Sequence, residues 1–135
     1  MTLVIDASVA VKLGVAEPGS DRARELVARG EKLIAPDLLP CEVASALWKK
    51  ELRGDLGALE RITALKASLD AFDELTPCKD LARAALDLAV SLRHPVYDCF
   101  YLVLAEMRTA VFVTADGRLL TRLQQGGWAG KFKAL

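Results

Sequence analysis

The chain has 135 residues, of which 53% are hydrophobic, and this is enough apolar material for one domain with one core. Eighteen basic and eighteen acidic residues give zero net charge, so bulk charge does not mark the chain as a nucleic-acid-binding protein. Disorder is excluded by the same composition. We expect a single domain over residues 1–135, located in the cytoplasm, because the sequence lacks an export signal and a long uncharged apolar run.

The three cysteines, Cys41, Cys78 and Cys99, are an odd number and do not have the spacing of a zinc site. Each falls in a segment with helical spacing or at the edge of one. We therefore expect all three to be reduced residues of the core.

The first third of the chain alternates between strands and helices. A β-branched run predicts a strand over residues 2–6, followed by a short helix over 9–15 with Ser8 available as its N-cap. Apolar residues at helical spacing then indicate a helix over 20–29, which stops at a glycine, and "KLIAP" predicts a strand over 32–36.

The remaining elements follow the same alternation. They are predicted as helices over 38–53 and 56–69, a short strand over 72–76, helices over 79–92 and 97–108, a buried strand over 110–114, a helix over 118–125 and an edge strand over 131–135. Short apolar strands separated by helices predict an α/β fold of three layers, with a mainly parallel central sheet of about five strands.

Four acidic residues occupy equivalent places in this pattern. Asp6 ends the first strand and Asp116 comes two residues after the strand over 110–114, whereas Glu42 and Asp98 lie in the early turns of helices. In a parallel sheet, a helix that follows or precedes a strand begins at the carboxyl edge. All four carboxylates are therefore expected at one edge of the sheet.

Each acid also has a simpler explanation. Asp98 and Asp116 are at helix N-termini, where a carboxylate caps the helix or interacts with its dipole, and Glu42 borders an apolar face as a solvated acid would. Asp6 is harder to explain this way, because it ends an apolar strand and Ser8 is available as a cap. Four independent caps also have no reason to converge on one edge.

A divalent cation explains such convergence. Four carboxylates within a few ångströms repel each other by about 1 to 4 kcal/mol per pair, and bound metal removes that repulsion. Oxygen ligands without cysteine or histidine favour Mg²⁺ or Mn²⁺ over zinc, and the only histidine, His94, is interpreted as a helix-end residue before Pro95. Metal held by carboxylates commonly acts on phosphates, so hydrolysis of a phosphodiester is the leading chemistry.

Four segments resemble the PIN-domain ribonucleases, and in particular the VapC toxins of type II toxin–antitoxin systems. The matching segments, in the family's order, are "VIDASVAVKL", "APDLLPCEVASAL", "YDCFYLVLAE" and "FVTAD". One departure is Gly117, which follows Asp116 where the family often has a larger polar residue.

This resemblance implies a metal-dependent endoribonuclease with Mg²⁺ or Mn²⁺ as cofactor. Asp6 and Asp98 would be the principal ligands, Glu42 and Asp116 would complete the cluster, and the hydroxyls of Ser8 and Thr114 would support it. The resemblance also implies an RNA substrate, a homodimer and a cognate VapB-like antitoxin that covers the active-site groove.

Three other functions remain possible at this point. A phosphatase of the haloacid dehalogenase type needs a second acid two residues after its nucleophile, where this chain has Ser8. A receiver module needs adjacent acids near the first strand, which are missing. A PIN-fold RNA-binding or scaffold module usually lacks one or more of the acids. If RNA is the substrate, Lys12, Lys49 and Lys50 are candidates to contact it, or are simply solvated surface lysines.

Overall fold

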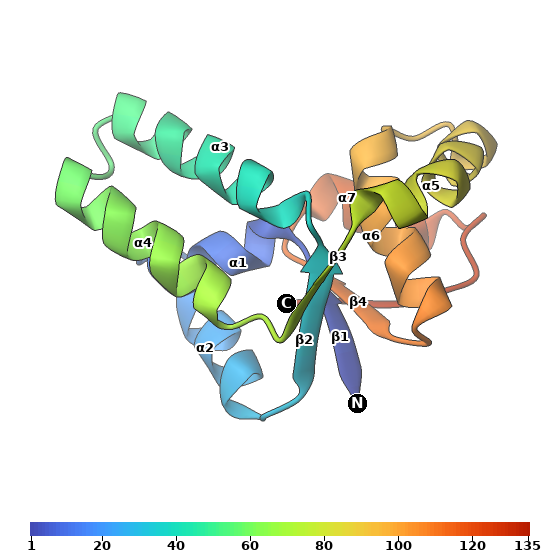
Figure 1. The fold of residues 1–135 in the computed structure, drawn as a ribbon, viewed down its shortest axis with the longest axis horizontal. Helices are drawn as coiled ribbons and strands as arrows, with labels where there is room; N and C mark the ends of the chain where they lie inside the picture. Colours follow the sequence, from blue (N-terminus) through green and yellow to red (C-terminus); the bar gives the residue numbers. More distant parts are fainter.

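The computed structural model describes all 135 residues as five strands and seven helices (Figure 1). In chain order the elements are β1 (Thr2–Ile5), α1 (Ala7–Gly14), α2 (Ser20–Ala28), β2 (Lys32–Pro36), α3 (Leu39–Leu52), α4 (Ala58–Asp70), β3 (Glu74–Thr76), α5 (Cys78–Leu92), α6 (Val96–Met107), β4 (Val111–Thr114), α7 (Gly117–Gln124) and β5 (Lys131–Ala134). Every predicted element is present, with ends that differ by at most a few residues. None of the helices has the length and apolar character needed to cross a bilayer.

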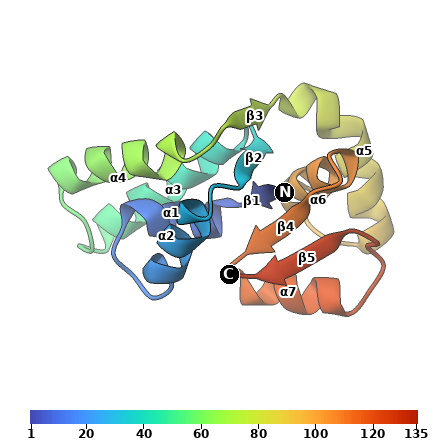
Figure 2. The same cartoon turned by 90° about the horizontal axis from the view of Figure 1, so that it is seen from below.

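The five strands form one sheet in the order β3-β2-β1-β4-β5, and all neighbours are parallel (Figure 2). The register pairs Leu3 of β1 with Leu33 of β2 on one side and with Val111 of β4 on the other. The sequence order reverses at β1, with β2 to one side and β4 to the other. Ligands of open parallel sheets bind beside the carboxyl ends of strands at such a point.

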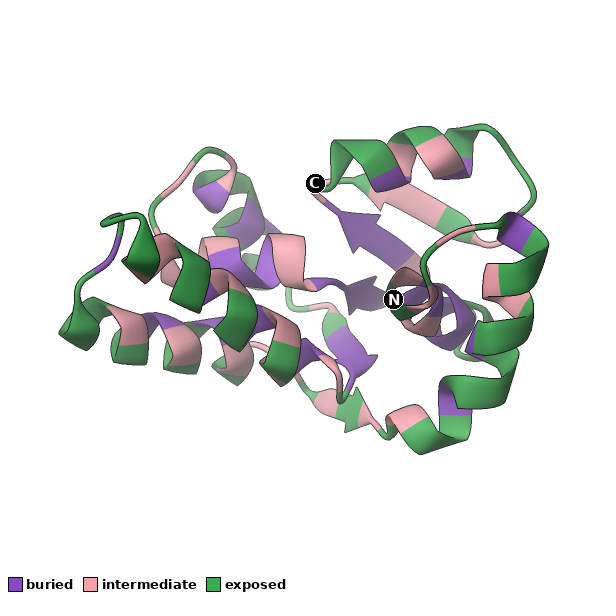
Figure 3. Cartoon of the chain, turned by 90° about the horizontal axis from the view of Figure 1, so that it is seen from above, coloured by how far each residue is buried: buried purple, intermediate pink, exposed green.

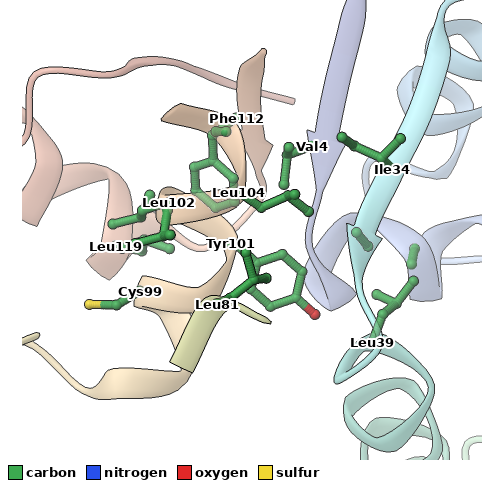
Figure 4. Packing of buried hydrophobic residues seen from close by; sticks show 14 of the residues in the cluster. Val4, Ile34, Leu39, Leu81, Cys99, Tyr101, Leu102, Leu104, Phe112 and Leu119 are labelled. Carbon is green, nitrogen blue, oxygen red and sulfur yellow. The ribbon is translucent and has the colours of Figure 1, made fainter. Parts of the chain in front are cut away.

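The two faces of the sheet are covered by different helices. Val4, Ile34 and Phe112 belong to the larger core cluster, which packs on α6 with α5 behind it (Figure 4). The neighbouring residues Leu3 and Ile5, together with Leu33 and Val113, pack on α1 and α2 in a second cluster. This period-two alternation confirms the predicted three-layer α/β fold.

Burial decreases from the middle of the sheet to its edges. Each of β1 and β4 has three buried residues in four, whereas β3 and β5 have none (Figure 3). The central strands are therefore read correctly as apolar runs, because both of their faces are covered. The edge strands are shorter or more polar, and β5 is confirmed as an edge strand.

Helices α3 and α4 form an antiparallel hairpin that projects to one side and packs against α1 (Figure 1). The approach of α1 to α4 is close: a Cβ atom added to Gly14 would lie 2.3 Å from the carbonyl oxygen of Ala64. Only glycine fits there, so Gly14 sets how closely the hairpin approaches the sheet.

Two predictions about individual residues are wrong. The N-cap of α1 is Asp6, not Ser8, because the helix begins two residues earlier than predicted, at Ala7. The Asp6 carboxylate accepts a hydrogen bond from the Val9 amide. Cys41 is exposed, and only Cys99 of the three free cysteines is fully buried. Cys41 lies in the first turn of α3 on its solvent side, which helical spacing alone did not reveal.

Candidate active site

The four predicted acids are at the carboxyl edge of the sheet. Asp6 directly follows β1 and Asp116 lies two residues beyond β4, while Glu42 and Asp98 are in the first turns of α3 and α6. Burial raises the pKa of Asp6 and of Glu42, and the negative charge of Asp98 adds to both rises.

Asp6 is held by neutral donors. The hydroxyls of Ser8 and Thr114 each donate to one of its carboxylate oxygens at 2.5 Å, and the Val9 amide donates at 3.3 Å. Burial nevertheless raises the pKa of Asp6 to about 6, because desolvation of the carboxylate outweighs these hydrogen bonds and the charge of Asp98 adds to it. Asp6 is therefore a buried acid that lacks a compensating cation.

The same two hydroxyls connect the ends of β1 and β4. Ser8 accepts from the Ala115 amide at 2.9 Å, Thr114 accepts from the Asp116 amide at 3.0 Å, and the two hydroxyl oxygens are 3.2 Å apart. This network fixes the Asp6 carboxylate relative to the loop that carries Asp116. The structure thus gives Ser8 and Thr114 a supporting position beside Asp6.

Glu42 has a buried partner that the sequence analysis missed. The Tyr101 hydroxyl, on α6, donates to Oε1 of Glu42 at 2.6 Å, and in Figure 4 it points away from the Tyr101 backbone toward α3. Desolvation raises the pKa of Glu42, and this hydrogen bond opposes the rise. Burial and the Glu42 charge raise the pKa of Tyr101 far above its usual value, so the tyrosine remains a donor.

Asp98 contacts the only histidine. Nε2 of His94 is 2.7 Å from Oδ2 of Asp98, and the His94 side chain is 15% exposed. His94 lies between α5 and α6, as interpreted from the sequence, but its contact with Asp98 four residues later was not foreseen. The i, i+4 spacing of the two residues was the available signal.

Asp116 is the N-cap of α7. Its Oδ1 accepts from the amides of Arg118 and Leu119 at 2.9 and 3.2 Å, as the simpler explanation of this residue requires. A larger residue would fit at Gly117, because a Cβ added there would have no neighbour within 4 Å. The structure therefore places all four acids at one edge of the sheet, with Asp116 as a helix cap.

The chemistry of this donor set, carboxylate oxygens without lysine or arginine partners, suits a hard divalent cation. None of the four carboxylates forms an ion pair with lysine or arginine, and His94 is the only basic partner that any of them has. Oxygen ligands are those that Mg²⁺ and Mn²⁺ prefer. As the side chains stand, however, no three histidine, cysteine or acidic residues form a ready metal cluster.

Comparison with known proteins decides the family. The family model described as "PIN domain" matches residues 3–124. The chain belongs to the PIN-domain family. This PIN domain is 34% identical over 121 residues to Ribonuclease VapC3 of Pyrobaculum aerophilum, covering 88% of this chain and 92% of the relative. It is 33% identical over 117 residues to Ribonuclease VapC9 of Mycobacterium tuberculosis, covering 87% of each chain.

A solved structure supports the fold over the whole chain. The crystal structure of PAE2754 from Pyrobaculum aerophilum superimposes with a TM-score of 0.74 at 26% identity, covering 98% of this PIN domain and 83% of that chain. The relatives named VapC confirm the resemblance of the four quoted segments to the VapC family. The superposition confirms the three-layer α/β fold that the alternation of strands and helices predicted.

Proposed function

We propose that this PIN domain is a metal-dependent endoribonuclease that hydrolyses RNA phosphodiester bonds at the carboxyl edge of its sheet. We further propose that it is the cytoplasmic toxin of a VapBC-type pair, active as a homodimer and inhibited by a VapB-like antitoxin. The relatives named VapC ribonucleases support the activity and the toxin role. The single observation that carries the site is a group of acids without lysine or arginine partners, one of them almost fully buried.

In this proposal Asp6 and Asp98 hold Mg²⁺ or Mn²⁺, and Glu42 and Asp116 complete the site. The cation, when bound, supplies charge neutralisation and a Lewis acid for the phosphate. Ser8 and Thr114 orient the Asp6 carboxylate, since each of its oxygens accepts from one of these hydroxyls.

Glu42 has a separate proposed role. Tyr101 occupies its Oε1, which leaves Oε2 to accept a proton from the attacking water. Burial raises the pKa of Glu42, which makes its carboxylate a better proton acceptor than a solvated one. Tyr101 is a positioning residue in this scheme.

The decisive experiment compares Asp98→Asn with Asp80→Asn, which removes an exposed acid from the first turn of α5. Both variants are incubated with a labelled RNA and Mn²⁺, and internal cleavage is followed. We expect Asp80→Asn to cleave like the wild type and Asp98→Asn to be slower by at least about 100-fold, because an essential charge at the reacting phosphate is lost.

The other outcomes separate the alternatives. Equal rates in the two variants would contradict the site, and cleavage that persists in EDTA would contradict the metal dependence. RNA binding without any cleavage by the wild type would favour the RNA-binding or scaffold module.

A further inference from the structure

A groove runs along α3 away from the candidate site. Its lining starts at Glu42 and Ala7 and continues past Ala46 to Lys49 and Arg53, and it encloses about 320 Å³. A second hollow, lined by Ser8, Ala115 and Lys12 among others, shares Ala7, Ala46 and Lys50 with the first. Because the two hollows share these residues, we describe them together as the α3 groove, which lies beside the start of α1.

Two of the lysines beside this groove are already engaged. Glu17 accepts from Lys12 at 3.1 Å and from Lys50 at 2.5 Å, and all three side chains are only 16–20% exposed. These two lysines lower the pKa of Glu17, so the glutamate is ionised at neutral pH. The three residues tie the loop after α1 to α3, and they carry one net positive charge between them.

Lys49 and Arg53, the other two cations of the groove, are not held by a buried ion pair. Lys49 and Arg53 are exposed, and Lys49 has no ion-pair partner, while Arg53 contacts only the exposed Asp55 at 3.3 Å. Arg53 is the C-cap of α3, four residues after Lys49, and Glu42 lies seven residues before Lys49 on the same face. At 1.5 Å per residue, Lys49 and Arg53 lie about 10 and 16 Å along the helix from Glu42.

We infer that the α3 groove binds the RNA backbone beside the scissile phosphate, with Lys49 and Arg53 contacting phosphates and Glu17 limiting how tightly the strand is held. The inference rests on the proposed function and names the path of its substrate. A row of cations that leads away from the proposed metal site attracts a polyanion that the carboxylates themselves repel. It also explains how a chain of zero net charge binds RNA.

The two pairs of cations therefore act differently. Loss of Lys49 and Arg53 removes phosphate contacts and leaves the packing of α3 unchanged, because neither side chain is buried. Loss of the Glu17 charge frees Lys12 and Lys50 and raises the net charge of the groove by one. Glu17→Gln is then expected to tighten RNA binding while it loosens the contact between α1 and α3.

The experiment measures binding in EDTA, so that neither metal nor cleavage contributes, by the anisotropy of a labelled single-stranded RNA at several salt concentrations. The variants are Lys49→Gln/Arg53→Gln, Glu17→Gln and, as control, Arg29→Gln, which removes an exposed cation at the end of α2. Each contact with a single strand contributes about 0.7 to the salt slope, so the double variant should lose about 1.4 and bind about 5- to 10-fold more weakly. Glu17→Gln should bind about 2- to 5-fold more tightly with a lower Tm, and Arg29→Gln should match the wild type.

Three results would overturn the inference. The double variant could keep the affinity and salt slope of the wild type, or Glu17→Gln could bind RNA more weakly. Alternatively, polyglutamate could bind as tightly as RNA and depend equally on Lys49 and Arg53, in which case the groove takes an acidic protein segment. If the protein cleaves RNA but its RNA affinity does not depend on these residues, the proposed role of the α3 groove is wrong and the nuclease proposal stands. If the groove binds RNA but the protein does not cleave it in Mn²⁺, the nuclease proposal is wrong and the groove proposal stands.

Discussion

Glu74 at the amino edge of the sheet and Asp6 and Glu42 at the carboxyl edge have opposite kinds of partners. At the amino edge, Glu74 forms ion pairs with Lys32 and Arg108, which hold its pKa down at about 2. At the carboxyl edge, Asp6 and Glu42 are bonded by hydroxyl groups, and their pKa values are raised by burial. Glu74 is neutralised within the chain, whereas Asp6 and Glu42 are held by hydrogen bonds without being neutralised.

This difference in partners distinguishes Asp6 and Glu42, the acids of the proposed site, from Glu74. An exposed carboxylate with two cations stabilises the folded chain through its charge, although only weakly. A buried carboxylate with neutral partners costs stability when ionised, and the cost is relieved by protonation or by a cation from solution. Ionised Asp6 therefore lowers the stability of the folded chain, and a cation bound beside it would relieve that cost.

Among the substitutions that test this difference, the largest change in stability is expected at Asp6. A rise in the pKa from 3.8 to about 6 corresponds to a cost of about 3 kcal/mol for the ionised carboxylate at pH 8. Because the folded state holds the proton more tightly, the free energy of unfolding should fall as the pH rises from about 4 through 6. Asp6→Asn should remove that dependence and stabilise the metal-free protein, as measured by urea denaturation at pH 5 and pH 8.

The control for Asp6 is Asp87→Asn, an exposed acid on α5 that should behave like the wild type. Millimolar Mn²⁺ should raise the Tm of the wild type and of Asp87→Asn, and should not raise that of Asp6→Asn together with Asp98→Asn. A wild-type stability that increases with pH between 5 and 8 would contradict the cost assigned to the Asp6 carboxylate.

The sequence was sufficient for the fold because the central strands are apolar on both faces and each helix has clear end signals. It was also sufficient for the positions of the acids, since strand order and direction follow from the alternation of elements. The partners of the acids were not predictable in the same way. Tyr101 appears within an apolar helix as one more core residue, and only the approach of α3 to α6 places its hydroxyl beside Glu42.

The Asp6 cap was missed for a similar reason. A serine two residues after a strand is a good N-cap by residue type, and the choice between Asp6 and Ser8 depends on where the chain turns. The carboxylate takes the cap position and the serine hydroxyl donates to it. Local preference therefore named the wrong cap, whereas the supporting position expected of Ser8 beside Asp6 agrees with the hydrogen bond between them.

A smaller effect is expected at Tyr101. Tyr101→Phe keeps the ring beside Phe112, whose centroid is 6.4 Å away, and removes only the donor to Glu42. Loss of a hydrogen bond to a half-buried carboxylate should lower the free energy of unfolding by about 2 kcal/mol. The hydrogen bond also lowers the pKa of Glu42, so the rising limb of the pH–rate profile should move to higher pH in Tyr101→Phe.

A merely structural role for Tyr101 predicts a different result. In that case stability would fall as described, but the pH–rate profile would keep its midpoint. Phe112→Leu, which disturbs the same packing without touching Glu42, is the matched control and should leave the profile in place.

The smallest effect is expected at the amino edge, where Glu74→Gln removes both ion pairs with Lys32 and Arg108. These side chains are 35–45% exposed, so solvent and salt screen their attraction, and the change in Tm should be smaller than that of Tyr101→Phe. Since the pKa of Glu74 is lowered to about 2 in the folded protein, its stabilisation is present above about pH 4.5 and is lost as the pH falls toward 2. Wild type and Glu74→Gln should therefore differ at pH 7 in low salt, converge near pH 2 and converge again at high salt, with equal rates of RNA cleavage throughout. A Glu74→Gln protein that cleaves RNA more slowly would remove the distinction between the two ends, because an acid neutralised within the chain would then contribute to the reaction.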